Sequence, residues 1–138
     1  MKKVFATIGT LALLAALAAC GSGGRGGEKE LASGKVGQMT VTLANSDGVL
    51  RHGDQELTVT FKDASGKAVD VGSASLNFFM PAMGAMPVMN NPATLTTTSA
   101  PGVYSGKVKI EMTGDWQAQI AYEGPAGSGK GSFPVKAQ

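Results

Sequence analysis

The sequence predicts an all-β protein, an antiparallel sandwich of the immunoglobulin type with about seven strands. Apolar and polar residues alternate with a period of two in several short segments, as expected for strands that bury one face. Clusters of Gly, Pro, Asp and Ser separate these segments at intervals of about 8–12 residues, which is typical of such sandwiches. No helical periodicity persists beyond a few residues.

The alternating segments follow one another along the chain. They are residues 39–43, 57–61, 74–78, 94–98, 104–112, 116–122 and 132–135. The last contains Pro134, which has no backbone N–H, so we expect it at a sheet edge. Tyr104 starts a strand directly after Pro101-Gly102. Two interpretations fit it equally: a tyrosine corner, or burial in the core.

Residues 1–19 are typical of an export signal. Lys2 and Lys3 precede an apolar run that is too short to span a bilayer, which needs about 20 residues. The run ends in Leu17-Ala18-Ala19-Cys20, which resembles the lipobox of bacterial lipoproteins. The resemblance implies cleavage before Cys20 and acylation of that residue. The alternative is an ordinary secreted protein with a chance cysteine. Cys20 is the only cysteine, so a lipidated chain keeps no free thiol.

The rest of the chain divides into a tether and one domain. Residues 20–35 predict a lipidated cysteine followed by a flexible Gly-rich tether with a reach of about 20 Å. Residues 36–138 have the length of a single domain. We therefore expect an extracytoplasmic protein anchored by lipid. By analogy with other lipoproteins, Gly21-Ser22 favours the outer membrane, facing the periplasm, in a Gram-negative cell; otherwise we expect the cell surface.

Charge and motif content exclude several functions. Without Lys2 and Lys3, ten Lys and Arg residues balance ten Asp and Glu residues, so no basic face for nucleic acid is expected. The sequence has no evident Ser/His/Asp set, phosphate loop or activated carboxylate pair, so we expect neither an enzyme nor a small-molecule substrate.

One stretch, from Phe78 to Met89, carries four of the seven methionines: Met80, Met83, Met86 and Met89, at intervals of three. Two prolines and a glycine within it disfavour a helix. A polyproline II conformation, with three residues per turn, would project all four from one side. Thioethers are soft ligands that select Cu(I). The alternative is that these methionines are flexible apolar filler at one end of the sandwich.

Strand parity predicts which loops meet. Successive antiparallel strands reverse direction, so alternate loops lie at the same end of the sandwich. This rule places His52, the methionine run, Met112 and Trp116 together.

We therefore predict a Cu(I) site, with Ag(I) as a mimic. The candidate ligands are Met80, Met83, Met86, Met89, His52 and Met112. Trp116 is a candidate for cation–π shielding of the ion, although core or rim packing is the alternative. His52 could instead be a solvated loop residue, and Met39 follows the inward pattern of its strand. With a single histidine, the chain has too few suitable ligands for a Cu(II) or Zn(II) site.

Three motifs together resemble the YtkA-like/FixH-like domain family. They are Phe78-Phe79-Met80-Pro81-Ala82-Met83, Pro101-Gly102-Val103-Tyr104 and Met112-Thr113-Gly114-Asp115-Trp116. The resemblance covers about residues 57–133 and implies an exported immunoglobulin-like domain, often linked with copper handling, heavy-metal efflux or haem–copper oxidase assembly. The residues of this chain that the family's motif picks out are Met80, Met83, Tyr104, Met112 and Trp116. Members often have histidine in the methionine loop, where this chain has Gly84-Ala85, which leaves the thioethers as the main ligands.

Two hypotheses follow. In the first, the protein buffers Cu(I) or hands it to an efflux-pump or oxidase-assembly partner. In the second, Met80–Met89 is a docking surface for another protein and binds no metal, since methionine-rich surfaces are adaptable. Replacing the methionines by leucine separates the two, because leucine keeps the apolar area and removes the sulfur.

Overall fold

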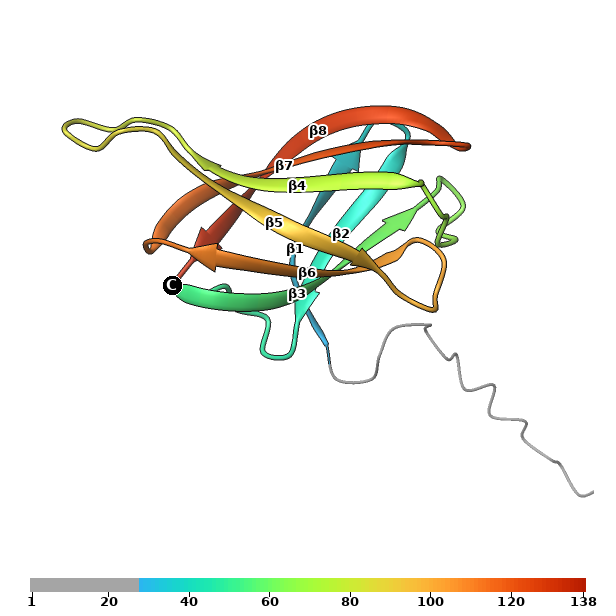
Figure 1. Ribbon diagram of the computed structural model, residues 1–138, viewed down its shortest axis with the longest axis horizontal. Coiled ribbons are helices and arrows are strands. Elements are labelled where there is room, and N and C mark those ends of the chain that lie inside the picture. Colours follow the sequence, from blue (N-terminus) through green and yellow to red (C-terminus); the bar gives the residue numbers. More distant parts are fainter. Residues whose placement is uncertain (1–27) are drawn as a thin grey trace, which may run out of the picture.

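A computed structural model describes residues 28–138 of the chain. The predicted signal peptide, Cys20 and the first part of the tether lie outside these residues. Eight strands make up the regular structure of the described part (Figure 1): β1 (Lys29–Val36), β2 (Met39–Asn45), β3 (Gly53–Lys62), β4 (Ser73–Met80), β5 (Met89–Thr97), β6 (Val103–Ile110), β7 (Gly114–Gly124) and β8 (Gly127–Ala137). No helix in residues 28–138 is long and apolar enough to cross a membrane.

The strands form two packed layers, and all neighbouring strands are antiparallel. Their order is β1-β2-β3-β6-β5-β4-β7-β8, with β5 shared between the two layers. The outermost strands, β1 and β8, pack against each other, so the sandwich is nearly closed like a barrel. The prediction of an all-β sandwich is confirmed, with eight strands in place of about seven. Pro134 lies in β8, an edge strand that pairs with β7, as expected.

The additional strand is β1, which occupies residues assigned to the tether. It pairs with β2 from Lys29 to Val36, and Val36 is fully buried. The domain therefore begins at Lys29, and the tether boundary at residue 35 was wrong. Small residues in β1 permit close packing: a Cβ at Gly34 would lie 2.6 Å from Cδ1 of Phe133. The glycine that suggested flexibility is needed for contact with β8.

The core fills the space between the inner faces of the two layers. Alternate residues of β2 and β3 point inward, including Val41, Leu43, Val59 and Phe61, all with no exposed surface. Phe61 makes edge-to-face contacts with Tyr104 and Tyr122, at centroid distances of 5.5 and 5.8 Å. Met39 is 7% exposed and belongs to the core, as predicted.

Tyr104 is buried, and its hydroxyl donates a hydrogen bond of 2.7 Å to the backbone oxygen of Gly72. A tyrosine corner would bond to backbone only a few residues upstream. Here the bond reaches from β6 to the β3–β4 connection, 32 residues away. Burial, together with the nearby carboxylate of Asp70, raises the pKa of the Tyr104 hydroxyl. Tyr104 is thus a core residue with an anchored hydroxyl.

Strand β5 changes partners halfway along its length. Residues Met89–Ala93 pair with β4, whereas Thr94–Thr97 pair with β6. The last part of β6, Val108–Ile110, pairs with β3 and lies beyond the β5–β6 ladder. A seam between the two layers therefore opens between the first half of β5 and the end of β6. The candidate site lies where this seam reaches the end of the sandwich.

Candidate metal site

The methionine run forms a β-hairpin arm, defined here as residues 81–88, that extends β4 and β5 beyond the sandwich (Figure 1). Its turn is Gly84-Ala85, flanked by reciprocal backbone hydrogen bonds between Met83 and Met86 of 3.1 and 2.9 Å. Gly84 has φ of +58° and Ala85 a negative φ, which is typical of a type II′ turn. The expected polyproline II conformation is therefore wrong, because a two-residue turn closes a hairpin instead.

The hairpin separates the four methionines into two pairs. Met80 pairs with Met89, and Met83 pairs with Met86 in the same register, three positions further along each strand. Side chains alternate between faces at each position, so an odd step places the second pair on the opposite face. Met80 is 7% exposed and Met89 is half-buried, whereas Met83 and Met86 are 67% and 44% exposed. The prediction that all four project from one side is wrong.

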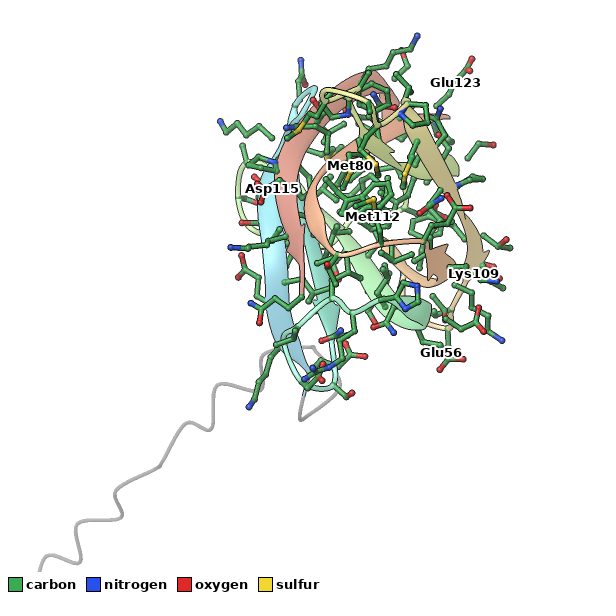
Figure 2. The ribbon with its side chains drawn as sticks, turned by 90° about the vertical axis from the view of Figure 1, so that its left-hand side faces the viewer. Glu56, Met80, Lys109, Met112, Asp115 and Glu123 are labelled. Atoms are coloured by element: carbon green, nitrogen blue, oxygen red, sulfur yellow. The ribbon has the colours of Figure 1, made fainter. Side chains whose placement is uncertain are left out.

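The predicted convergence of loops at one end is confirmed. The first residue of β3, Gly53, pairs with Ile110 at the end of β6, which places His52 and Met112 at the same end. Glu111 is hydrogen-bonded to Asn91 of β5, close to the start of the hairpin arm. Figure 2 looks onto this end, with Met80 and Met112 near its middle.

Three methionines lie in or against the core at this end of the sandwich. We call Met80, Met89 and Met112 the inner methionines. Met80 and Met89 form a cross-strand pair on the inner face, and Met89 and Met112 are half-buried against the core. The methyl group of Met80 lies 3.1 Å from the position that a Cβ on Gly114, two residues after Met112, would occupy. Met80 is buried and the other two are partly exposed, and thioethers at the apolar end of a core suit a soft monovalent ion.

Trp116 is fully buried behind Met112. Its Nε1 donates a hydrogen bond of 3.1 Å to the backbone oxygen of Met112. This contact fixes the main chain of Met112, which lies in the short connection between β6 and β7. Trp116 is therefore a core residue, and its role in shielding an ion stays a prediction.

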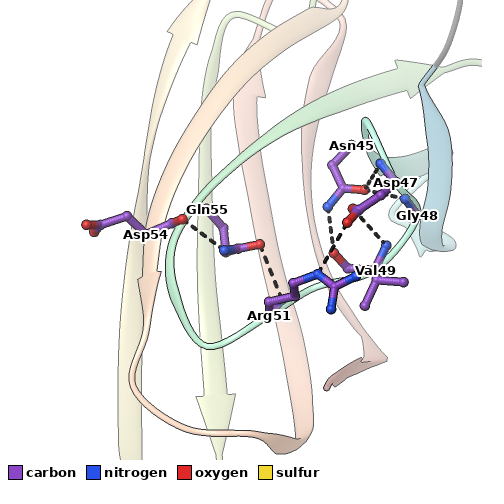
Figure 3. A network of polar contacts seen from close by, with 7 residues as sticks. All are labelled: Asn45, Asp47, Gly48, Val49, Arg51, Asp54 and Gln55. Atoms are coloured by element: carbon purple, nitrogen blue, oxygen red, sulfur yellow. Dashed lines mark hydrogen bonds and ion pairs between the residues drawn. The ribbon is translucent and has the colours of Figure 1, made fainter.

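His52 is exposed on the loop that precedes β3. Polar contacts hold this loop (Figure 3): the side chain of the buried Asn45 binds Val49 and Gly48, and Arg51 pairs with Asp47 at 3.3 Å. Partial desolvation raises the pKa of Asp47, but hydrogen bonds from the Val49 N–H and from Arg51 outweigh it and lower the pKa overall. The structure brings His52 to the predicted end of the sandwich, but its side chain is exposed, whereas the inner methionines lie in or against the core.

The other common metal ligands do not gather in the described part of the chain. Across residues 28–138, no group of three or more His, Cys, Asp or Glu side chains is placed to hold a metal ion. Met80, Met89 and Met112 lie in or against the core near the hairpin end, and thioether ligands favour Cu(I) over Zn(II) or Cu(II).

One residue near the site, Asn91, was not found from the sequence. It is 5% exposed, and both ends of its amide bind Glu111: Nδ2 donates to Oε2 at 3.0 Å, and Oδ1 accepts from the backbone N–H at 3.1 Å. A signal was present, because the inward positions of β5 are Met89, Asn91, Ala93 and Leu95, so a polar residue interrupts an apolar row.

Comparisons with known proteins identify the family. The sequence model of the YtkA-like family matches residues 34–121, more than half of the chain, from β1 into β7. A comparison with curated proteins gave no match, and neither did a comparison with solved structures. The family match spans the hairpin arm and all three inner methionines. The chain therefore belongs to the YtkA-like family.

Proposed function

We propose that this YtkA-like protein is an exported, lipid-anchored metal-binding protein that holds Cu(I), with Ag(I) as its mimic, through the thioethers of Met80, Met89 and Met112. It buffers the ion or hands it to an efflux-pump or oxidase-assembly partner. The site has no catalytic role in this proposal.

The observation that supports the proposal most is the strand register. It pairs Met80 with Met89 on the inner face, at the end of the sandwich where Met112 emerges from β6. Three soft donors from three chain segments thus lie in or against the core near one end of the sandwich, which supports the proposal. Methionines needed only as filler would be expected to be fully buried, but Met89 and Met112 keep part of their surface in solvent.

Thioether ligation predicts binding that resists acid. A thioether carries no proton to lose, so affinity through the inner methionines should be nearly the same at pH 5 and pH 7. An imidazole ligand would compete with protons over this range. Comparing the native chain with His52→Ala at both pH values therefore measures whether His52 is also a ligand.

A Cu(I) titration against a competing chelator tests the proposal. The native chain should bind Cu(I) more tightly than micromolar. A Met80→Leu/Met89→Leu/Met112→Leu variant should lose this affinity while it remains folded, because Met-to-Leu changes cost under about 1.5 kcal/mol each.

The matched control is Met83→Leu/Met86→Leu, which makes the same chemical change at the two exposed methionines of the arm. This variant should keep the native affinity for Cu(I). The proposal fails if the native chain shows no binding tighter than micromolar. It also fails if the inner triple variant binds as well as the native chain.

Lipid anchoring is tested separately. Mass spectrometry of the chain purified from membranes should find an acylated N-terminal Cys20, and Cys20→Ser should release the protein from the membrane fraction. Two or more acyl chains give stable attachment, so an unlipidated chain should not sediment with membranes. Recovery of the Cys20→Ser variant in the membrane fraction would contradict this part of the proposal.

A second candidate function is protein docking through the outer part of the arm. In the described part of the chain, the exposed large hydrophobic residues are Met83, Met86 and Val88, and all three lie on it. A docking role predicts that Met83→Leu/Met86→Leu keeps the interaction, whereas Met83→Asp/Met86→Asp abolishes it. Photo-crosslinking from position 83 in cells measures both, and loss of the crosslink in the leucine variant would argue against simple apolar docking.

A further inference from the structure

The two layers of the sandwich separate at the seam, next to the inner methionines. β6 runs past the point where β5 stops pairing with it, and a groove of about 550 Å³ lies along this seam, lined in part by Pro92, Thr94 and Val108. Main-chain pairing with β5 therefore does not fix the end of β6 or the connection that carries Met112. β3 pairs with β6 as far as Ile110, so side-chain contacts are what join the following residues, 111–112, to β5.

Asn91 is the side chain that spans the seam. Its amide forms two hydrogen bonds to one residue, Glu111: 3.0 Å to the carboxylate and 3.1 Å from the backbone N–H. Two bonds from a rigid planar amide fix both the position and the orientation of the residue that they reach. Since burial of an unpaired amide is costly, Asn91 also depends on Glu111 to remain inside.

Asn91 is adjacent to two of the inner methionines. Along β5 it is the next inward residue after Met89, and its partner Glu111 directly precedes Met112. Trp116 holds the other side of the same short segment through the backbone oxygen of Met112. The main chain of residues 111–112 is thus held by side chains of two strands, β5 and β7, which both belong to the layer that contains β4.

We infer that Asn91 is a positioning residue of the thioether site, which holds Met112 within reach of Met80 and Met89. This inference rests on the proposed function for its metal-binding consequence, but its structural consequence can be measured without metal. Residues that orient metal ligands commonly change affinity by about 10–100-fold when they are replaced.

Asn91→Ala and Glu111→Gln form the test and its control. Asn91→Ala removes both hydrogen bonds. Glu111→Gln removes the charge but keeps a side-chain oxygen that can accept from Nδ2, as well as the backbone bond. Glu111→Ala removes only the side-chain bond and should have an intermediate effect. Full-length protein, purified from membranes in detergent, is used throughout.

The first readout is the methyl NMR spectrum of metal-free protein with ¹³C-labelled methionine methyl groups, assigned by Met-to-Leu variants. Asn91→Ala should shift or broaden the Met112 resonance and leave Met83 and Met86 unchanged. Glu111→Gln should leave all of them close to native. An unmoved Met112 resonance in Asn91→Ala would overturn the inference, as would an equal change in Glu111→Gln. If Asn91→Ala does not fold, Glu111→Ala replaces it in the comparison: it should still shift the Met112 resonance, by a smaller amount, and an unmoved resonance would overturn the inference.

The second readout is Ag(I) affinity. Asn91→Ala should weaken it by about 10–100-fold, with Glu111→Gln close to native. Native protein that fails to bind Ag(I) contradicts the proposed function, and the methyl spectra then still decide whether Asn91 positions Met112. Native protein that binds Ag(I), with Asn91→Ala binding equally well, contradicts the positioning role alone.

Discussion

The indole Nε1 of Trp116 and the backbone oxygen of Met112 are joined by a hydrogen bond of 3.1 Å. Trp116 is fully buried near the start of β7, whereas Met112 is half-buried and lies between strands. The bond therefore connects the rigid core to the most weakly paired part of the candidate site. Substitution of Trp116 in the core should consequently change the position of the half-buried Met112.

Trp116→Phe should lower the free energy of unfolding by about 2 kcal/mol, because a hydrogen bond is lost and a smaller ring leaves a cavity. It should also shift the Met112 methyl resonance. Denaturant titration and the methionine methyl spectrum measure the two effects. If stability falls but the Met112 resonance stays in place, the bond does not position Met112.

Gly114→Ala should disturb Met80 directly. Gly114 has φ of +141°, and an added Cβ would lie 3.1 Å from the Met80 methyl group. We expect the free energy of unfolding to fall by more than about 1 kcal/mol and the Met80 methyl resonance to shift. Gly53→Ala is the matched control, since Gly53 has φ of +103° but no neighbour within 4 Å of the added Cβ. It should destabilise the protein through the backbone alone and leave the Met80 resonance unchanged.

Tyr104→Phe should cost about 1 kcal/mol at neutral pH, because it removes the hydroxyl that binds Gly72 while keeping the ring in the core. Urea denaturation measures the change. An unchanged midpoint would show that water satisfies the Gly72 carbonyl equally well when the hydroxyl is absent.

The contribution of Tyr104 should also depend on pH. Burial and the Asp70 carboxylate raise its pKa above the usual 10.0, so the folded state holds this proton more tightly than the unfolded state. The resulting stability is complete below the unfolded pKa and is lost as the pH rises through the folded one. The stability difference between native protein and Tyr104→Phe should therefore shrink above pH 10. A difference that stays constant across that range would contradict the raised pKa.

Two deletions test the start of the domain. Removing residues 29–36 takes away β1 and the fully buried Val36, and uncovers Phe133 of β8. Loss of Val36 alone should cost about 2 kcal/mol, so thermal unfolding should occur at a clearly lower temperature. Removing residues 21–27 should leave the unfolding temperature unchanged. Equal effects of the two deletions would mean that β1 is not part of the cooperative unit.

Much of the fold could be predicted from the sequence because its strands each bury one face. Segments such as Met39-Thr40-Val41-Thr42-Leu43 place every apolar residue on one side, and the structure buries those residues. Strand parity also predicted that His52, the hairpin arm and Met112 share an end. β1 was missed because it lies at an edge, where small and charged residues pack well but resemble a linker.

The site could be predicted only in part. The spacing of Met80, Met83, Met86 and Met89 suggested a period of three, but Gly84-Ala85 closes a hairpin whose period is two. Proline content alone could not distinguish these conformations, because proline is compatible with both. Asn91 was missed since its importance depends on Glu111, 20 residues away, and on a change of strand partner that no local pattern records.

Pro81 and Pro87 lie on opposite strands of the arm, and both are exposed. An exposed two-stranded ribbon normally offers free N–H and C=O groups to which another chain can add a strand, the first step of aggregation. Pro87 directly follows the hydrogen-bonded Met83–Met86 pair, at a position whose N–H would point away from the partner strand, so the proline removes an outward donor and interrupts such pairing. The arm can therefore keep Met83 and Met86 in solvent while offering another chain fewer positions at which to add a strand.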